Sequence, residues 1–370
     1  MAKTDFGNQK PTQARAWVLD TIMVYRDECF WVDFMGNGDN SILQVANEMK
    51  KVRGADRALF TLIPDLTSTG VVGGGTLRGN EEAMTSQTCE VQIDYIRNAV
   101  INSGKMDDQR SVIDFREHAK DSLGNWRAQT MDGLIFNTLS GIGYANETDG
   151  SARVVAAGQT PLTGLTFAAD VTAPTANRHF NATATGLTIG STASISSANV
   201  FTYKTVLAAN AEAQVKGLKP LKNGGSTYYV LVVHPYQMMQ LKADADFNRN
   251  LITAGERGDK NPVFNGAVVT MDGMIIHKHN RVVNTKRAAS GSKWGTSGLV
   301  DGARALLLGR QALLVADLLG DTSWEEQDED YKDRNGISIG MMIGMKKPVF
   351  IAKSTGTSED FGVICINSSI

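Results

Sequence analysis

A glycine-rich loop decides the fold of this chain: Thr67-Ser-Thr-Gly70-Val-Val-Gly73-Gly74-Gly75-Thr-Leu-Arg78-Gly79-Asn80. The apolar run 59–63 precedes the loop, and residues 89–100 follow it with an apolar alternation that predicts a second strand. The alternating side chains expected on one face are Val91, Ile93 and Tyr95. Residues 59–106 therefore predict a long two-stranded arm with the glycines at its tip. Isolated hairpins are marginally stable in water, so this arm needs a surface to lie on.

A single long helix is predicted after this arm, from Asp107 to about Ser140. Asp107 is suited to cap the helix, and no proline interrupts it. Its apolar stripe consists of Val112, Phe115, Ala119, Leu123, Trp126, Met131 and Leu139. At 1.5 Å per residue such a helix is roughly 50 Å long, about the width of a whole domain. Compact enzymes seldom need a long arm leading into so long a helix, whereas subunits that overlap their neighbours do.

The composition is that of an ordinary folded protein. The 370 residues include 42% apolar and 21% charged side chains, enough for a sizeable core or for two or three domains. The net charge is −2. A dedicated sequence-specific DNA-binding protein is usually more basic, because it must displace counterions from phosphates.

The cysteines and the apolar stretches exclude further classes. Cys29, Cys89 and Cys365 form no C-x-x-C pair, which predicts neither a disulfide framework nor a zinc site and favours a reducing compartment. The first residues contain no apolar signal segment. The most apolar long stretch, 303–319, is interrupted by two charged residues and predicts no membrane span.

The remaining first half of the chain has weaker signals. Residues 1–58 predict an arm with two helices, of which the second covers 42–49 and is capped by Ser41. Residues 144–197 are rich in Ala, Thr, Ser and Gly, and predict an insertion that is irregular or made of short strands and is exposed. A helix that ends at Gly217 is expected next.

The chain from residue 226 onward predicts a mixed α/β unit and then a β-rich tail. Residues 228–233 form a continuous apolar run, as expected for a strand buried on both faces, and 305–308 form another. Asp272-Gly273 between apolar segments predicts a tight hairpin. Residues 337–345 alternate strictly between apolar and other side chains, which predicts a strand. The fold class expected is therefore α+β.

No constellation of side chains predicts catalysis. His277 and His279 point the same way on a predicted strand and could share a metal, but no third ligand has suitable spacing. The plainer interpretation is a half-exposed strand at a sheet edge. His234 follows a buried strand without a nucleophile motif, so we expect it to form a local hydrogen bond where the strand turns into a helix. We predict no cofactor and no metal.

The glycine-rich loop also fails as a phosphate-binding loop. The Walker pattern requires Lys and then Ser or Thr after its last glycine, but Asn80 follows Gly79. We therefore expect these glycines to serve contact and shape adjustment between subunits, without a ligand.

The acidic run at 325–330 resembles a calcium loop only in its charge, because it lacks EF-hand spacing. A solvated face or a charge contact between subunits explains it better. Arginines that could pair with it on a neighbour are Arg78, Arg97 and Arg257.

Nine short motifs occur in a fixed order over about residues 14 to 351, among them Thr76-Leu-Arg-Gly-Asn-Glu-Glu-Ala83 and Val232-Val-His-Pro235. The full set lies at 36–45, 76–83, 91–100, 104–110, 114–123, 132–136, 232–235, 261–266 and 346–350. In this order the chain resembles the major capsid proteins of tailed phages with the HK97-like fold. The residues of these motifs are similar to those in the coat proteins of short-tailed, N4-like phages.

This resemblance implies an α+β, HK97-like subunit with five parts and no enzymatic activity. The parts are an N-terminal arm (1–58), an extended β-hairpin loop (59–106), a long spine helix and peripheral domain (107–220, with the insertion at 144–197), an axial domain (221–320) and a C-terminal return to the peripheral domain (321–370).

The resemblance also implies a function. A major capsid protein self-assembles into the icosahedral shell that encloses the double-stranded DNA genome of a tailed phage. Its expected partners are other copies of itself in hexamers and pentamers, the portal protein, decoration or scaffold proteins, and packaged DNA through weak non-specific contact, with no membrane. Its expected location is the virion, after assembly in the host bacterial cytoplasm. The alternatives are an encapsulin-like compartment shell protein and a metal-dependent enzyme centred on His277 and His279.

Ten residues are expected at contacts between subunits. Most lie in the extended loop, and the others are an aromatic residue of the N-terminal arm and three charged residues. They are Gly70, Gly73, Gly74, Gly75, Arg78, Gly79, Trp17, Arg97, Glu325 and Glu326.

Overall fold

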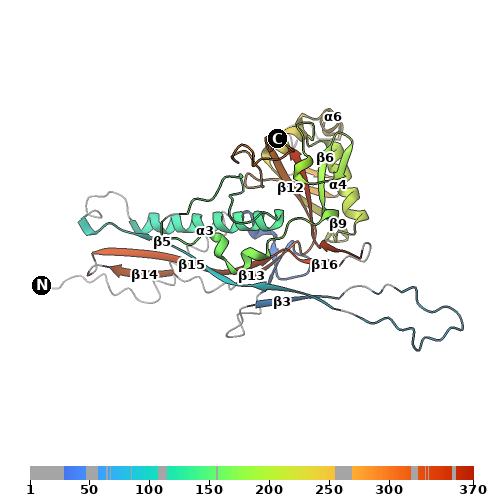
Figure 1. The fold of residues 1–370 in the computed structure, drawn as a ribbon, viewed down its shortest axis with the longest axis horizontal. Coiled ribbons are helices and arrows are strands. Elements are labelled where there is room, and N and C mark those ends of the chain that lie inside the picture. Colours follow the sequence, from blue (N-terminus) through green and yellow to red (C-terminus); the bar gives the residue numbers. More distant parts are fainter. Residues whose placement is uncertain are drawn as a thin grey trace.

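The computed structural model describes residues 29–46, 57–63, 66, 68–84, 86–106, 115–155, 157–254, 269–317, 324–329, 331, 333–351 and 356–370. Figure 1 shows an elongated molecule in which one long helix lies along a sheet. A compact region of strands and helices stands at one end of this helix, and a loop projects beyond the body on the same side. Helices and strands are mixed along the chain, as the sequence predicts.

The elongated part contains a six-stranded sheet. Its strands follow the order β1 (Met35–Gly36), β2 (Leu43–Ala46), β13 (Leu313–Asp317), β15 (Arg334–Lys346) and β14 (Trp324–Glu329), with β5 (Asp94–Ile101) also paired to β15. The alternation predicted for residues 337–345 is confirmed, because the five apolar side chains are buried: Ile337, Ile339, Met341, Ile343 and Met345. Successive side chains of a strand point to opposite faces, so these five share one face, and it packs against the long helix.

The long helix is α3 (Phe115–Ser140), 26 residues or roughly 39 Å in length. Its predicted beginning, residues 107–114, lies outside the described residues. Ala119 and Leu123 of the predicted stripe pack on Ile337 and Ile339 of β15. From residue 131 to the end every side chain is buried, including the polar Asn137. This half departs from the amphipathic pattern because it lies between the two sheets of the molecule.

The compact region is built on an eight-stranded sheet. Its order is β10 (Val269–Met271), β11 (Met274–Lys278), β9 (Ser226–Val233), β12 (Gly302–Leu308), β18 (Val363–Ser369), β6 (His179–Thr183) and β7 (Gly186–Ile189), with β8 (Leu221–Asn223) also paired to β9. The predicted hairpin is confirmed. Asp272 and Gly273 adopt φ of 49° and 74°, as a type I′ turn between β10 and β11 requires.

The central strands of this sheet are buried on both faces, which explains their continuous apolar runs. One face, with Leu231 and Leu307, packs against helices α4 (Tyr203–Val215), α5 (Pro235–Ala243) and α6 (Ala245–Ala254). The opposite face, with Val232 and Leu306, shares a core with the buried half of α3. The helix predicted to end at Gly217 is confirmed as α4.

The helix predicted over 42–49 is wrong within the described residues. Residues 43–46 form strand β2, which pairs in parallel with β13 and buries Leu43 and Val45 alternately. The hydroxyl of Ser41 does not cap a helix, because it donates to the carbonyl oxygens of Gly36 and Gly38 at 3.1 and 2.6 Å. Pairing with a strand 270 positions later is a tertiary effect that overrides the local pattern.

The strand predicted over 89–100 is divided into β4 (Gln87–Gln92) and β5. The buried face changes at the division: Val91 is buried in β4, but Ile96 is buried in β5 and Tyr95 is exposed. The division has a structural cause, since β4 pairs with β3 (Arg57–Leu62) whereas β5 pairs with β15. Because β4 and β5 pair in different sheets, the alternation of buried and exposed side chains can shift by one residue between them.

The insertion at 144–197 contains short strands, as one of its two predicted forms, but the expectation that it is exposed is corrected in part. This segment contains the short 3₁₀ turns η3 (Leu162–Gly164), η4 (Thr166–Asp170) and η5 (Ala176–Arg178), and then β6 and β7. Phe167 and Phe180 from it are buried, each in a different core. Strand β6 pairs in parallel with β18, so the segment completes the eight-stranded sheet.

The end of the chain crosses from one sheet to the other. After β15, the strands β16 (Val349–Ile351) and β17 (Ser358–Asp360) pair with each other, and β18 then enters the eight-stranded sheet. The eight-stranded sheet contains β8 to β12, which are most of the strands within residues 221–320. It therefore also includes strands from 179–189 and 363–369. No helix in the described part of the chain is long and apolar enough to cross a membrane.

Candidate assembly surface

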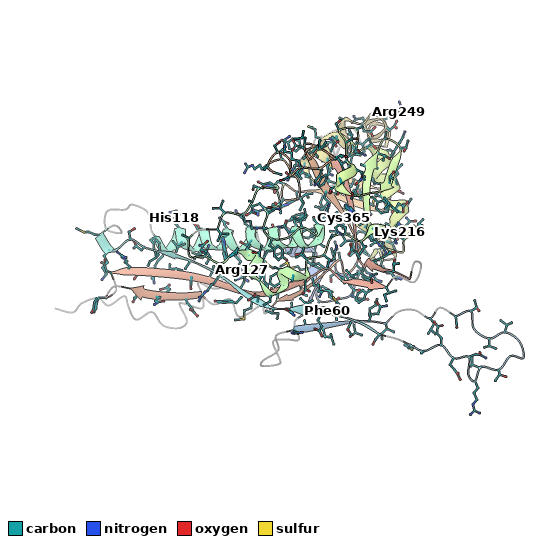
Figure 2. The ribbon with its side chains drawn as sticks, viewed as in Figure 1. Phe60, His118, Arg127, Lys216, Arg249 and Cys365 are labelled. Carbon is teal, nitrogen blue, oxygen red and sulfur yellow. The ribbon has the colours of Figure 1, made fainter. Side chains whose placement is uncertain are left out.

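The projecting loop connects β3 to β4. The two strands pair from Arg57 opposite Gln92 to Leu62 opposite Gln87. Beyond this base, the chain leaves the body, and Figure 2 shows the side chains near its tip surrounded by open space. We call residues 66–86, in their described part, the extended loop.

The predicted contact glycines take up two kinds of position in this loop. Gly70, Gly73 and Gly79 adopt φ of 74°, 66° and 89°, a left-handed backbone that favours glycine. Gly74 lies in open space without such a backbone. A Cβ at Gly75 would collide with the side chain of Val71. The backbone conformation therefore accounts for Gly70, Gly73 and Gly79, and close packing accounts for Gly75, whereas nothing within the chain explains Gly74.

The loop is shaped by its own carboxylates. The amide of Ser68 donates to Glu82 Oε2, and the amide of Gly79 donates to Glu81 Oε2, each at 2.6 Å. The amide of Asn80 also donates to the carbonyl oxygen of Leu77 at 3.0 Å. These bonds define turns without burying any of the surrounding side chains.

Apolar side chains concentrate in this region to an unusual degree. Of 19 large apolar side chains exposed in the described part of the chain, seven lie between residues 59 and 84. They are Leu59, Ile63, Leu66, Val71, Val72, Leu77 and Met84. Val72 is 88% exposed and Met84 is 72% exposed. Scattered exposed apolar residues are normal, but a contiguous set marks a surface for another molecule.

The base of the loop is firmly attached to the body. Ala58, Cys89 and Val91 form a small core with Leu314 and Ala316 of β13. A Cβ at Gly344 of β15 would collide with the carbonyl oxygen of Gln92, so glycine allows β4 to cross β15 closely. The role of Gly344 was not predicted, although its place in the alternating run of β15 was the available signal.

Strands β16 and β17 extend this attachment. The amide of Ile351 in β16 donates to Gln87 Oε1 at 2.8 Å. In β17, the carboxylate of Asp360 forms an ion pair with Lys347 at 3.0 Å, and both side chains are fully buried. Glu359 pairs with Arg178 at 3.1 Å, and this pair is also buried. Removing one partner of such a buried pair would leave an uncompensated buried charge, which is strongly destabilising.

The predicted charged contact residues lie on a different part of the molecule. Arg97 is on β5, and Glu325 and Glu326 are on β14, at the opposite end of the body from the extended loop (Figure 1). All three are exposed. Glu326 forms an ion pair with Arg116 of α3 in the same chain. Arg78 is exposed in the loop. Trp17 and Arg257 lie outside the described residues.

The histidines expected as alternative metal ligands stack on aromatic rings. His279 lies against Phe30 and Phe136, with ring centroids 4.5 and 5.2 Å apart. Burial, with a smaller contribution from Arg281, lowers the pKa of His279 to about 4. Within the described residues, no group of three or more His, Cys, Asp or Glu side chains could hold a metal ion.

His234 is part of local structure, as predicted. Its Nδ1 accepts a hydrogen bond from the amide of Tyr236 at 3.3 Å, and its own amide donates to Gln237 Oε1 at 3.0 Å. These bonds cap helix α5. Burial, with a smaller contribution from the nearby Lys286, lowers the pKa of His234 to about 4.

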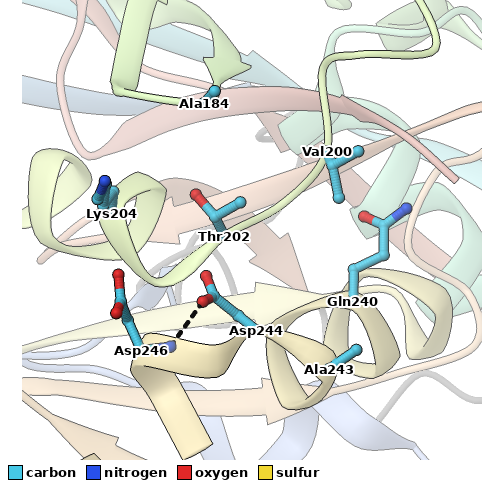
Figure 3. A pocket seen from close by; sticks show the side chains of 8 residues that line it. All are labelled: Ala184, Val200, Thr202, Lys204, Gln240, Ala243, Asp244 and Asp246. Carbon is cyan, nitrogen blue, oxygen red and sulfur yellow. Dashed lines mark hydrogen bonds between the residues drawn. The ribbon is translucent and has the colours of Figure 1, made fainter. Parts of the chain in front are cut away.

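A cavity of about 400 Å³ lies between the beginning of α4 and the junction of α5 and α6 (Figure 3). Its polar groups are used by the fold. Asp244 accepts from the amides of Tyr203 and Asp246 at 2.8 and 3.0 Å. Gln240 accepts from the amide of Phe201 at 3.1 Å and donates to the carbonyl oxygen of Ser369 at 3.0 Å. The cavity therefore offers few free groups to a ligand.

One buried cation joins the eight-stranded sheet to the end of helix α3 and was not predicted. Arg304 of β12 donates to the carbonyl oxygen of Ser140, at the end of α3, and to Asn367 Oδ1 of β18 at 2.9 Å. The carbonyl end of a helix favours a positive charge. Burial lowers the pKa of Arg304, so these contacts are needed to hold its charge in the core.

Comparison with known proteins gives a consistent answer. A family model described as phage capsid protein matches residues 5–370. A major capsid protein of Pseudomonas phage KPP25 is 38% identical over 366 residues, which cover 98% of this chain and 96% of that protein. The solved capsid of Ralstonia phage GP4 is 27% identical, with a TM-score of 0.73 over 93% of this chain and 92% of its own.

The fold is also found in more distant capsids. A chain from the capsid asymmetric unit of cyanophage Pam1 is 18% identical and has a TM-score of 0.72, covering 100% of this chain and 96% of its own. The predicted α+β, HK97-like class is thus confirmed. The chain belongs to the phage capsid protein family.

Proposed function

We propose that this chain, a phage major capsid protein, builds its shell by laying the extended loop across a neighbouring copy. The observation that carries the proposal is the set of seven exposed apolar side chains on residues 59–84, attached to the body through a buried base. Burial of apolar surface contributes a favourable free energy of about 25 cal/mol per Å². Contact with a second copy would therefore be favoured over exposure to water.

The two sheets supply a rationale for the arrangement of subunits. The six-stranded sheet with α3 would form the peripheral domain, and the eight-stranded sheet with α4, α5 and α6 would form the axial domain around five- and six-fold axes. The strands from 179–189 and 363–369 would then belong to the axial domain as well. Copies related by rotation in pentamers and hexamers would each receive a loop and donate one.

The shell would enclose the double-stranded DNA of a tailed phage. The net charge of −2 fits a wall that contacts DNA weakly and without sequence preference. A portal protein and decoration or scaffold proteins would be further partners, and assembly would take place in the cytoplasm of the host bacterium. The chain would act as a structural protein and not as an enzyme. Its relatives are phage capsid proteins, and none of the observations above favours an encapsulin-like compartment.

Deletion of residues 69–79 tests the role of the loop. We expect a soluble subunit with an unchanged circular dichroism spectrum, because the deleted residues contribute to none of the buried clusters. We expect no closed shells by electron microscopy. Substitution of Gly74 by Ala in the full-length chain is the matched control and should assemble normally. Normal shells from the deletion variant would disprove the proposal.

A second measurement separates a phage shell from a compartment. Particles purified from infected cells are treated with nuclease and their contents are extracted. We expect protected double-stranded DNA. Particles that hold protein cargo and no DNA would instead indicate a compartment shell.

A further inference from the structure

The side chain of Arg304 on β12 is a buried cation without a counter-ion. Arg304 is only 5% exposed, and among the described residues it forms no ion pair. Its Cζ lies 5.8 Å from the ring centroid of Trp294. A buried charge is stable only when hydrogen bonds or opposite charges replace its lost water. The groups around Arg304 therefore decide whether it can remain in the core.

Two oxygen atoms accept hydrogen bonds from Arg304. Its Nη1 donates to the carbonyl oxygen of Ser140, the last residue of α3, and its Nε donates to Asn367 Oδ1 of β18 at 2.9 Å. Figure 2 labels Cys365, which lies two residues before Asn367, close to this end of α3. Loss of Arg304 from its place would remove the polar contact between the end of the helix and the eight-stranded sheet.

The third nitrogen of the Arg304 guanidinium meets a nitrogen of another side chain. Nη2 of Arg304 lies 3.4 Å from Nε2 of His179 on β6, and Nδ2 of Asn367 lies 2.7 Å from the same atom. The orientation of the Asn367 amide is fixed, because its oxygen accepts from Arg304 and its Nδ2 also donates to Asn181 Oδ1 at 2.9 Å. Nε2 of His179 thus faces two donors and is the unprotonated, accepting nitrogen of the ring.

Two cations act on His179 from neighbouring elements. Burial, with smaller contributions from Arg304 and from Lys347, which directly follows β15, lowers the pKa of His179 to about 4. The unfolded chain binds this proton near pH 6.5, so acid favours states in which the imidazole has left the network. Protonation in place would set an imidazolium against a guanidinium at a buried site, where like charges are least tolerated.

The other ionisable groups around His179 supply no compensating negative charge. The thiol of Cys365, opposite His179 in the ladder of β6 and β18, is fully buried, and burial raises its pKa. The carboxylates of this region already belong to two buried ion pairs, which are Arg178 with Glu359 and Lys347 with Asp360. A proton on Nε2 therefore meets neither an acceptor nor an unpaired anion.

We propose that His179 is an acid-sensitive lock on the joint between α3 and the eight-stranded sheet, and that its protonation displaces Arg304 from the carbonyl oxygen of Ser140. Rotation of the Asn367 amide cannot restore the network, because its oxygen would then leave Arg304 and its nitrogen would face the guanidinium. Arg304 would keep a single acceptor for all of its N–H groups, which is too little to hold a buried charge. The lock does not depend on the assembly role of the extended loop.

Hydrogen exchange at the end of α3 tests the lock in the unassembled, full-length subunit. The amides of Gly141 and Ile142 donate to the carbonyl oxygens of Thr138 and Asn137 at 3.2 and 2.9 Å, so they report on this end of the helix. After correction for the intrinsic exchange rate, we expect their protection to fall at least about tenfold between about pH 7.5 and 4.5. Protection that does not change with pH would overturn the inference.

Variants separate the lock from a general effect of acid. His179→Gln supplies an amide oxygen that can accept from Asn367 and does not titrate, so protection at Gly141 and Ile142 should become independent of pH. Arg304→Met should lower this protection already at neutral pH, because the joint is absent. His234→Gln is the matched control and should keep the wild-type profile, since burial lowers the pKa of His234 to about 4 as well. A loss of protection that persists in His179→Gln would overturn the inference.

The wild-type subunit alone supplies a further criterion that holds even where a variant does not fold. Nuclear magnetic resonance of isotope-labelled histidine gives the pH at which His179 binds its proton. The lock requires this midpoint to coincide with the midpoint at which Gly141 and Ile142 lose protection. Separate midpoints would overturn the inference and leave the role of the extended loop untouched, because that role is measured in shell formation.

Discussion

The base and the tip of the extended loop belong to one hairpin but differ in nearly every physical respect. At the base, Val91 is fully buried and strand β4 crosses β15 at a glycine. At the tip, Val72 is 88% exposed and Gly74 has open space around it. The base is stabilised by contacts within the subunit, whereas the tip has only a few hydrogen bonds of its own.

The difference shows how one subunit can be both stable and able to assemble. Buried contacts determine whether the chain folds, so their loss should be measured as stability. Exposed apolar and charged groups at the tip contribute little to folding, so their loss should be measured as assembly. A substitution that lowered stability at the tip, or impaired assembly alone at the base, would contradict this division.

The largest effect is expected in the body. Phe136 of α3 is fully buried and contacts the rings of Trp31, Phe30 and His279. Phe136→Ala should lower the free energy of unfolding by about 4 kcal/mol, through lost burial and the cavity left behind. Leu77→Ala at the tip should change it by less than about 0.5 kcal/mol. Urea denaturation of unassembled subunits measures both, and a comparable loss in the two variants would contradict the division.

A smaller effect is expected where the arm crosses the sheet. Gly344→Ala places a Cβ against the carbonyl oxygen of Gln92 and should cost about 3 kcal/mol, since the backbone of β4 must move. Gly74→Ala meets no atom and should change the stability by less than about 0.5 kcal/mol. Thermal unfolding of the two variants is the measurement. A tolerated Gly344→Ala would show that β4 can shift on β15.

Sequence patterns predicted the parts of this fold that depend on nearby residues. The alternation of β15, the Asp272-Gly273 turn and the run of β9 are each encoded within a few positions, and they are confirmed. The extended arm was recognised from its glycines and the absence of a ligand motif. Its anchoring was not, because the contact of Gly344 with Gln92 joins residues 252 positions apart.

The errors have the same cause. Residues 43–46 carry apolar side chains compatible with either helix or strand, and the distant β13 decides for strand. Phe180 seemed part of an exposed insertion because its neighbours are small and polar, yet β18 brings it into the core. For the contact residues, one sequence shows which side chains are unusual but not which surface of another copy they meet.

Acid should weaken the body through its buried histidines. Burial, with smaller contributions from nearby cations, lowers the pKa of His179, His234 and His279 to about 4. The unfolded chain binds these protons near pH 6.5, so stability is fully present above pH 6.5 and is lost as pH falls toward 4. We expect a combined loss of on the order of 2 kcal/mol, because partial exposure reduces each contribution.

One carboxyl group acts in the opposite direction. Burial raises the pKa of Asp132, which accepts from Cys29 and from the amide of Phe30, so its protonation favours the folded state as pH falls. The loop and its base, residues 57–106, contain no histidine. Urea midpoints of the wild-type subunit between pH 7.5 and 4.5 measure the loss, and His279→Phe should reduce it. A flat profile would show that the rings accept protons without cost.

The smallest effect is expected in the base of the loop, at its end nearest the body. Arg57 and Glu90 form an ion pair at 3.1 Å on the outer face of the hairpin, and their side chains are 54% and 53% exposed. Exposed pairs contribute little, so a double-mutant cycle with Arg57→Ala and Glu90→Ala should give a coupling energy of about 0.5 kcal/mol that decreases with added salt. A coupling energy above about 1.5 kcal/mol, unchanged by salt, would mean that the arm is stabilised within the subunit. In that case the hairpin would be rigid before any neighbour arrives, and assembly would select a preformed arm rather than order a loosely held one.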